Sequence, residues 1–221
     1  MKILKQLINT EDSGWVLVQK WIEQATNPVE ILPRTLSKAE KELLSIQVTT
    51  RSPMGALIYE TGGLLVDHGW LRILGSGHEK LDRGIVEWNF HKTDHQLNSD
   101  IQYLLIADDV LGGYFAINNG GLGDVIGKVY YFAPDTLDWE NLDVSYSEFL
   151  TWALSGNIAL FYELYRWESW EKDLRSLNGN QVFSFMPPLF TKESKNINNN
   201  HRKIVPITEN YSLSMELKSQ I

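Results

Sequence analysis

The segment from Tyr103 to Leu154 constrains the fold most, because short, mostly apolar runs alternate in it with dense turn signals. Three of these runs have the length of buried strands rather than of helices. They are Tyr103–Ala107, Tyr114–Ile117 and Lys128–Phe132. Glycine and asparagine residues lie between the runs and tolerate backbone conformations that most residues avoid. The short connections predict an antiparallel meander.

A helix is expected directly after this meander. Ser145 and Glu148 have the S-x-x-E spacing of a capping box, in which each side chain accepts a hydrogen bond from the other residue's backbone N–H. The apolar residues from Phe149 to Leu154 then share a broad helical stripe, which needs a surface to cover. The sequence therefore predicts one α+β domain over residues 1–221, in which an antiparallel sheet packs against helices.

Segments on either side of the meander add to this prediction. Trp15, Val18 and Ile22 follow Ser13 at helical spacing and predict a second helix packed on the sheet. Residues 78–99 are polar and are expected to be irregular, and Ile204–Ile207 with Tyr211–Leu217 are expected to form a closing pair of strands. The predicted core contains Trp15, Ile22, Leu105, Phe115, Tyr131, Phe149 and Trp152.

Acidic charge is concentrated in the central part of the chain. Residues 100–175 contain eight Asp and five Glu against two Lys and two Arg, a balance of −9, whereas the whole chain carries −8. A phosphate-binding surface needs basic side chains, so nucleic acid is not an expected partner. Two interpretations remain, a solvated surface that aids solubility or a docking face for a basic protein. The predicted turns would contribute Asp109, Asp124, Asp135, Asp138 and Glu140 to such a face.

The absence of cysteine excludes disulfides, cysteine nucleophiles and thiolate metal sites. The first residues, MKILKQLINTEDSG, lack the apolar core and the cleavage site of a signal peptide. No apolar run reaches the length of a transmembrane helix, so no membrane association is expected. These features predict a cytoplasmic protein.

Polar residues at the ends of apolar strands allow a chemical interpretation as well. Asp67 and His68 could be a base with its orienting acid, and Asp108 with Asp109 could be paired carboxylates or ligands of a divalent cation. The structural interpretation is that these groups cap turns or form salt bridges, for example with Arg72. The alternative polar site therefore contains Asp67, His68, Arg72, Asp108 and Asp109.

Two further sequence features resemble ligand-binding motifs, a histidine pair and the glycine-rich segments. His91 and His95 have the i, i+4 spacing of a metal-binding pair, but their segment has weak helical character. The glycine-rich segments match neither of the common phosphate-binding loops. No metal and no other cofactor is expected.

Four blocks carry a family resemblance: TTRSPMGALIYETGGLLVDHGWLRILGSG, ADDVLGGYFAINNGG, VYYFAPDTLDWE and YSEFLTWALSG. Together they resemble a bacterial family known as domain of unknown function 2625, over nearly the whole chain. The order of ADD-x-x-GG-x-F, VYYF and an S-x-x-EFL helix is also remotely similar to the SMI1/KNR4 (SUKH) superfamily. The second resemblance implies an SMI1/KNR4-like α+β fold. Many bacterial members of that superfamily are immunity proteins, and others are scaffold or regulatory domains.

These observations lead to two functional expectations. The first is a non-catalytic protein-binding module of immunity or regulatory type, whose acidic face meets a basic protein such as a toxin. The second is a small-molecule-binding protein or hydrolase that uses the alternative polar site. An accessible cleft that gathers those five residues would favour the second, and dispersed or buried side chains would favour the first.

Overall fold

The computed structural model describes residues 1–90, 92 and 101–220. Within these residues, one sheet runs in the order β1-β2-β3-β4-β5-β6-β7, and every neighbouring pair is antiparallel. Its strands are β1 (Val29–Pro33), β2 (Thr61–Val66), β3 (Leu71–Leu74), β4 (Tyr103–Asp109), β5 (Tyr114–Asn118), β6 (Val129–Ala133) and β7 (Asp138–Val144). The expected antiparallel α+β architecture is therefore present.

Helices and a separate hairpin surround this sheet. The hairpin pairs β8 (Gln181–Met186) with β9 (His201–Pro206). The α-helices are α1 (Leu4–Leu7), α2 (Trp15–Glu23), α3 (Leu36–Ile46), α4 (Pro53–Glu60), α5 (Ile85–Phe90), α6 (Tyr146–Ser155), α7 (Ile158–Phe161), α8 (Trp170–Leu174) and α9 (Ile207–Lys218). Short 3-10 turns are η1 (Glu163–Tyr165), η2 (Lys192–Ser194) and η3 (Ile197–Asn199).

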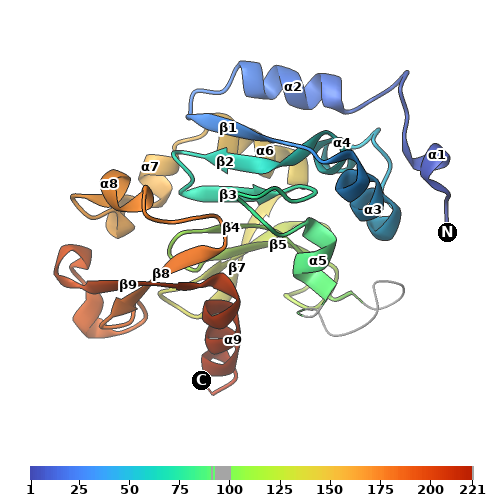
Figure 1. Ribbon diagram of the computed structural model, residues 1–221. Helices are drawn as coiled ribbons and strands as arrows, with labels where there is room; N and C mark the ends of the chain where they lie inside the picture. Colours follow the sequence, from blue (N-terminus) through green and yellow to red (C-terminus); the bar gives the residue numbers. More distant parts are fainter. Residues whose placement is uncertain (91, 93–100, 221) are drawn as a thin grey trace.

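The two faces of the sheet are covered by different parts of the chain. In Figure 1, α6 lies behind the sheet, whereas α5, the β8–β9 hairpin and α9 lie in front of it. Phe115 packs on Phe149 of α6, with ring centroids 4.9 Å apart, and its neighbour Tyr114 packs on Tyr211 of α9 at the same centroid distance. Because adjacent strand residues point to opposite faces, β5 contributes to both layers of the core.

The central part of the chain folds as its sequence predicts. The three expected strands are β4, β5 and β6, with ends that differ by one or two residues. Ser145 Oγ accepts a hydrogen bond from Glu148 N, and Glu148 Oε2 accepts one from Ser145 N, so the capping box is confirmed. Of the predicted core, Leu105, Phe115, Tyr131 and Phe149 are buried, and Trp15, Ile22 and Trp152 are partly buried against it.

Both edge strands of the sheet were missed by the sequence analysis. In β1 only Leu32 is buried, and in β7 no residue is fully buried. An edge strand that packs on few neighbours lacks the apolar alternation by which strands are recognised. The expectation of an irregular segment over residues 78–99 was also wrong in part, because Ile85–Phe90 forms helix α5.

The prediction of a strand at Tyr211–Leu217 was wrong, because this segment belongs to helix α9. Tyr211, Leu213, Met215 and Leu217 alternate with polar residues, which imitates a half-buried strand. The helix instead buries Ile207, Tyr211 and Ser214, which follow i, i+4 and i+7. As a result, Leu213 is left 52% exposed on the surface of the helix.

Glu42 of α3 is a buried carboxylate at the start of α5. Its Oε2 accepts a hydrogen bond of 2.6 Å from Val86 N. Burial, opposed in part by that hydrogen bond, raises the pKa of Glu42 from its ordinary value of 4.5 to about 7. The folded protein therefore holds this proton up to a higher pH than the unfolded chain does. The contribution of Glu42 to the free energy of unfolding falls as the pH rises from about 4.5 to about 7.

We expect Glu42→Gln to remove this loss of stability, because the amide keeps an acceptor for Val86 N and carries no charge. Urea unfolding should give equal stabilities near pH 4.5, and at pH 8 the variant should be more stable by about 2–3 kcal/mol. Glu40→Gln on the same helix is the matched control for loss of a carboxylate from α3. A Glu42→Gln variant that is less stable than the wild type at pH 8 would contradict the assignment.

Candidate functional site

A buried cluster of two arginines and one aspartate joins the main sheet to the C-terminal hairpin. Arg72 on β3 and Asp108 on β4 are direct cross-strand neighbours. Arg72 Nε lies 2.6 Å from Asp108 Oδ1, and Arg83 Nη1 lies 2.6 Å from Asp108 Oδ2. All three side chains are almost completely buried. One carboxylate therefore holds two guanidinium groups in the interior.

The remaining hydrogen bonds of the arginines reach the segment that leads into β8. Arg72 Nη1 donates to the carbonyl of Gln181 at 2.5 Å, and Arg83 Nη2 donates to the carbonyl of Gly179 at 2.6 Å. Arg72 Nη2 also donates to the carbonyl of Asp109 at 2.7 Å. Because each bond has a charged donor, these contacts fix where β8 begins relative to β3 and β4.

We expect Asp108→Asn to lower the free energy of unfolding by about 3–5 kcal/mol, because two buried arginines would lose the carboxylate that they share. Asp138→Asn is the matched control, since Asp138 forms an exposed ion pair and should cost no more than about 1 kcal/mol. Urea denaturation of the two variants checks this difference. Equal stabilities would contradict a central role for the buried cluster.

Asp109 points to the opposite face of the sheet from Asp108. Its Oδ1 accepts hydrogen bonds from the backbone N–H groups of Leu111 and Gly113, and its Oδ2 accepts from the hydroxyls of Tyr131 and Tyr162. Burial raises the pKa of Asp109, whereas these hydrogen bonds oppose the rise. The expectation that Asp109 lies on an exposed acidic face was wrong, because its carboxylate is sealed inside this polar cage.

Asp67 and His68 lie apart from Asp108 and Asp109, at the turn between β2 and β3. Asp67 forms an ion pair with Arg166, whose guanidinium stacks over the rings of Trp70 and Trp170 at 5.0 and 4.3 Å. His68 is exposed. The five residues of the alternative polar site are thus divided among a turn, an ion cluster and a carboxylate cage. They do not share one open cleft among the described residues.

Two members of that alternative site line a common cavity. His68 and Arg72 border a space of about 60 Å³. The carboxylates of Asp108 and Asp109 do not line it. No group of three or more metal-ligating side chains occurs within residues 1–90, 92 and 101–220, and His91 and His95 lie outside the described residues.

The other predicted acidic residues divide between the two ends of β6. Asp135 precedes β7, Asp138 begins it, and Glu140 lies two residues further on. These three form what we call the acidic turn. Asp135 accepts a hydrogen bond from the Tyr165 hydroxyl, and Asp138 forms an ion pair with Lys218 of α9. Asp124, in contrast, is exposed in the loop before β6.

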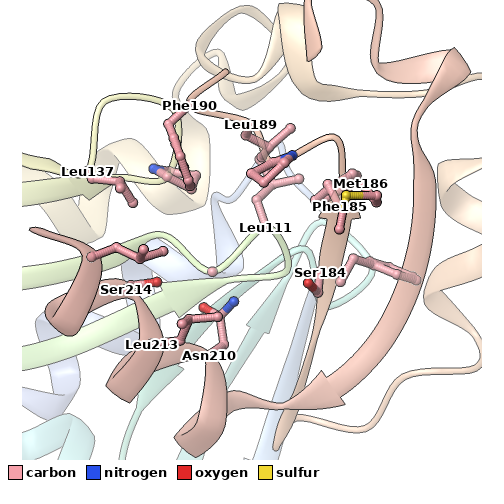
Figure 2. A pocket seen from close by; sticks show the side chains of 15 residues that line it. Leu111, Leu137, Ser184, Phe185, Met186, Leu189, Phe190, Asn210, Leu213 and Ser214 are labelled. Carbon is pink, nitrogen blue, oxygen red and sulfur yellow. The ribbon is translucent and has the colours of Figure 1, made fainter. Parts of the chain in front are cut away.

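An apolar groove lies directly beside the acidic turn, between β8, α9 and two turns of the main sheet. Figure 2 shows side chains from these separate segments around a common space. The volume of this space is about 180 Å³. We call it the β8–α9 groove. The residues that line it are Leu111, Gly112, Pro134, Leu137, Phe183, Ser184, Phe185, Met186, Pro188, Leu189, Phe190, Asn210, Leu213, Ser214 and Leu217.

Large apolar side chains on the groove are unusually exposed. Met186 is 64% exposed, Leu213 is 52% exposed and Phe190 is 38% exposed. Single exposed apolar residues are common on protein surfaces, but a group gathered around one concave site is typical of binding surfaces. Exposed apolar area therefore borders the groove on both the β8 side and the α9 side.

A few polar groups lie among these apolar side chains. The Asn210 Oδ1 atom accepts a hydrogen bond of 2.8 Å from the Tyr114 hydroxyl, which fixes the orientation of the amide. Within the described residues, Asn210 Nδ2 and the hydroxyls of Ser184 and Ser214 make no hydrogen bond to another group of the protein. A small number of oriented polar groups in an apolar site is the usual composition of a binding pocket.

The sequence analysis did not find this groove. Its lining residues come from segments around positions 111, 134–137, 183–190 and 210–217, which are adjacent only after folding. The alternating apolar residues of Tyr211–Leu217 were an available signal. On a helix, such alternation must leave some of them outside the core.

A family described as "Protein of unknown function DUF2625" matches residues 4–210. The chain belongs to the DUF2625 family. The family match contains the ion cluster, the acidic turn and β8, and it ends within α9.

Relatives match the DUF2625 chain along nearly its full length. YbfG of Escherichia coli K12 is 47% identical over 218 residues, which is 99% of this chain and 98% of the relative. A protein of Haemophilus influenzae is 45% identical over 220 residues, which is 100% of this chain and 96% of the relative. Both relatives carry the description uncharacterized.

No helix within residues 1–90, 92 and 101–220 is long and apolar enough to cross a membrane.

Proposed function

We propose that this DUF2625 protein is a non-catalytic protein-binding module of immunity or regulatory type, and that it binds a basic protein through the β8–α9 groove and the acidic turn. The observation that carries the proposal is the position of the groove, which places exposed apolar side chains directly beside exposed carboxylates. A partner segment with one bulky apolar side chain and nearby Lys or Arg residues would match both features.

The volume of the groove supports an anchoring side chain as its occupant. Pockets for drug-sized ligands and cofactors usually have volumes of about 300–1,000 Å³. A cavity of about 150 Å³ is sufficient for one benzene ring. At about 180 Å³, the groove has room for one large aliphatic or aromatic side chain. Such anchors usually dominate the binding energy of protein interfaces.

The charges beside the groove support a basic partner. Leu137 lines the groove, and it lies between Asp135 and Asp138 in the sequence. Lys218 neutralises part of this charge, whereas Glu140 is exposed and, among the residues that the structure describes, has one contact of 3.4 Å with the Thr136 hydroxyl. Complementary charges near an apolar anchor accelerate association and oppose binding of acidic proteins.

The remote similarity to the SMI1/KNR4 (SUKH) superfamily supports the immunity or regulatory part of the proposal. Immunity proteins bind toxins and neutralise them without chemistry of their own, and a basic toxin would complement the acidic turn. The five residues of the alternative polar site lie in three separate places, and this separation favours a binding module over a hydrolase. In a cytoplasmic immunity protein, the groove and the acidic turn would form the toxin-binding face.

Selection from a phage-displayed library of random dodecapeptides on the immobilised protein tests this function directly. We expect enrichment of peptides that carry Leu, Met, Phe or Trp next to Lys or Arg. The affinity of a selected peptide, measured by fluorescence anisotropy, should fall at least about tenfold in Leu213→Asp, because a charge would enter the apolar site. Asp138→Asn should also weaken binding, and higher salt should reduce the effect of that substitution.

Two matched controls separate the groove from a general effect of charge or of exposed leucine. Asp124→Asn removes a carboxylate at the opposite end of β6, and Leu160→Asp replaces an exposed leucine on α7; neither should change the affinity. Enrichment of acidic or purely polar peptides, or no enrichment at all, would contradict the proposed function. Equal losses in Leu213→Asp and Leu160→Asp would contradict the assignment to the groove.

A further inference from the structure

An ion pair lies beside the β8–α9 groove. Asp138 is the first residue of β7 and Lys218 is the last residue of α9, so their contact connects the acidic turn to α9. The residues before them, Leu137 and Leu217, both line the groove. The pair is accessible to solvent, since the Asp138 side chain is 67% exposed and the Lys218 side chain 36%.

The carboxylate of Asp138 is only partly used by the protein. Lys218 Nζ and the backbone N–H of Trp139 both donate to Oδ1. Within the described residues, Oδ2 accepts no hydrogen bond. The hydrogen bond from Lys218 lowers the pKa of Asp138, so the carboxylate stays ionised at neutral pH. Asp138 is therefore a charged acceptor at the edge of an apolar site, with one oxygen available.

An exposed lysine–aspartate pair is readily replaced. Such pairs contribute little to stability, because solvent screens the charges and a long side chain must be ordered to form the contact. Arginine can approach a carboxylate with two parallel N–H donors and thereby engage both oxygens. An incoming arginine would have a geometric advantage over Lys218, which engages one oxygen.

We propose that Asp138 is the residue that selects a basic side chain of the partner, and that Lys218 is its intramolecular competitor. In the free protein Lys218 forms an ion pair with Asp138 and thereby connects α9 to the acidic turn. In the complex, a Lys or Arg close to the partner's apolar anchor takes this position, and Lys218 turns to solvent. This inference rests on the proposed function and specifies which chemistry the partner must present beside the groove.

The two roles of Lys218 predict opposite results. If Lys218 competes with the partner, Lys218→Met should tighten binding of the selected peptide by about three- to fivefold, since removal of an exposed ion pair is worth a factor of this order. If Lys218 only positions α9, the same substitution should weaken binding. Lys20→Met on the distant helix α2 is the matched control for loss of one positive charge, and it should leave the affinity unchanged.

The closing experiment is a double-mutant cycle measured by fluorescence anisotropy. The selected peptide and a twin with Gln in place of each Lys and Arg are titrated against the wild type, Lys218→Met, Asp138→Asn and the double variant. We expect tighter binding in Lys218→Met only for the basic peptide, and no effect of Lys218→Met in the Asp138→Asn background. Urea unfolding of each variant verifies that α9 stays folded.

The outcomes separate this inference from the proposed function. Unchanged or weaker binding in Lys218→Met, together with the expected loss in Leu213→Asp, would overturn the competitor role and leave the docking groove intact. Tighter binding of both peptides in Lys218→Met would overturn the role of Asp138 in selecting a cation. Failure to select any apolar and basic peptide would contradict both proposals.

Discussion

The shared carboxylate of Asp108 is the interaction on which the arrangement of this protein depends. Backbone pairing holds the main sheet together, whereas the β8–β9 hairpin is a separate sheet that reaches it through single backbone hydrogen bonds, such as the one from Phe183 N to the carbonyl of Val110. Asp108 adds a buried link between the two, because it binds Arg72 and Arg83, which in turn bind carbonyl groups just before and at the start of β8. A buried ion cluster adds little net stability over apolar packing, but its geometry accepts few alternatives. It therefore fixes the wall of the groove that β8 provides.

Adjacent acidic residues in β4 serve opposite layers of the structure. Asp108 faces the C-terminal hairpin, and Asp109 faces Tyr131 of β6 and Tyr162, the residue directly after α7. The cage around Asp109 holds the turn at Leu111 and Gly113, and Leu111 lines the groove. Both carboxylates are thus used to shape the scaffold. In the acidic turn, by contrast, Asp138 and Glu140 are exposed, and these are the carboxylates that the proposed partner would meet.

The extent to which the sequence predicts this structure differs between its parts. The strands around Leu105, Phe115 and Tyr131 were predictable because both of their faces are apolar and turn residues lie between them. Helix α6 was predictable because its cap is local in sequence. The edge strand β7 was not, because it packs on one neighbour and carries polar residues. The groove was not predictable because it is formed by four segments that are distant in sequence. The exposure of Leu213 was not predictable either, because Tyr211–Leu217 was interpreted as a strand.

The central claim, that the β8–α9 groove is the binding surface, is tested most directly by ¹H–¹⁵N NMR of the labelled protein during titration with a selected peptide. The account predicts shifts centred on the backbone amides of Leu111, Leu137, Phe185 and Leu213, with weak or no shifts in α2 and β1. Shifts centred on α2 and β1, or around His68, would contradict it.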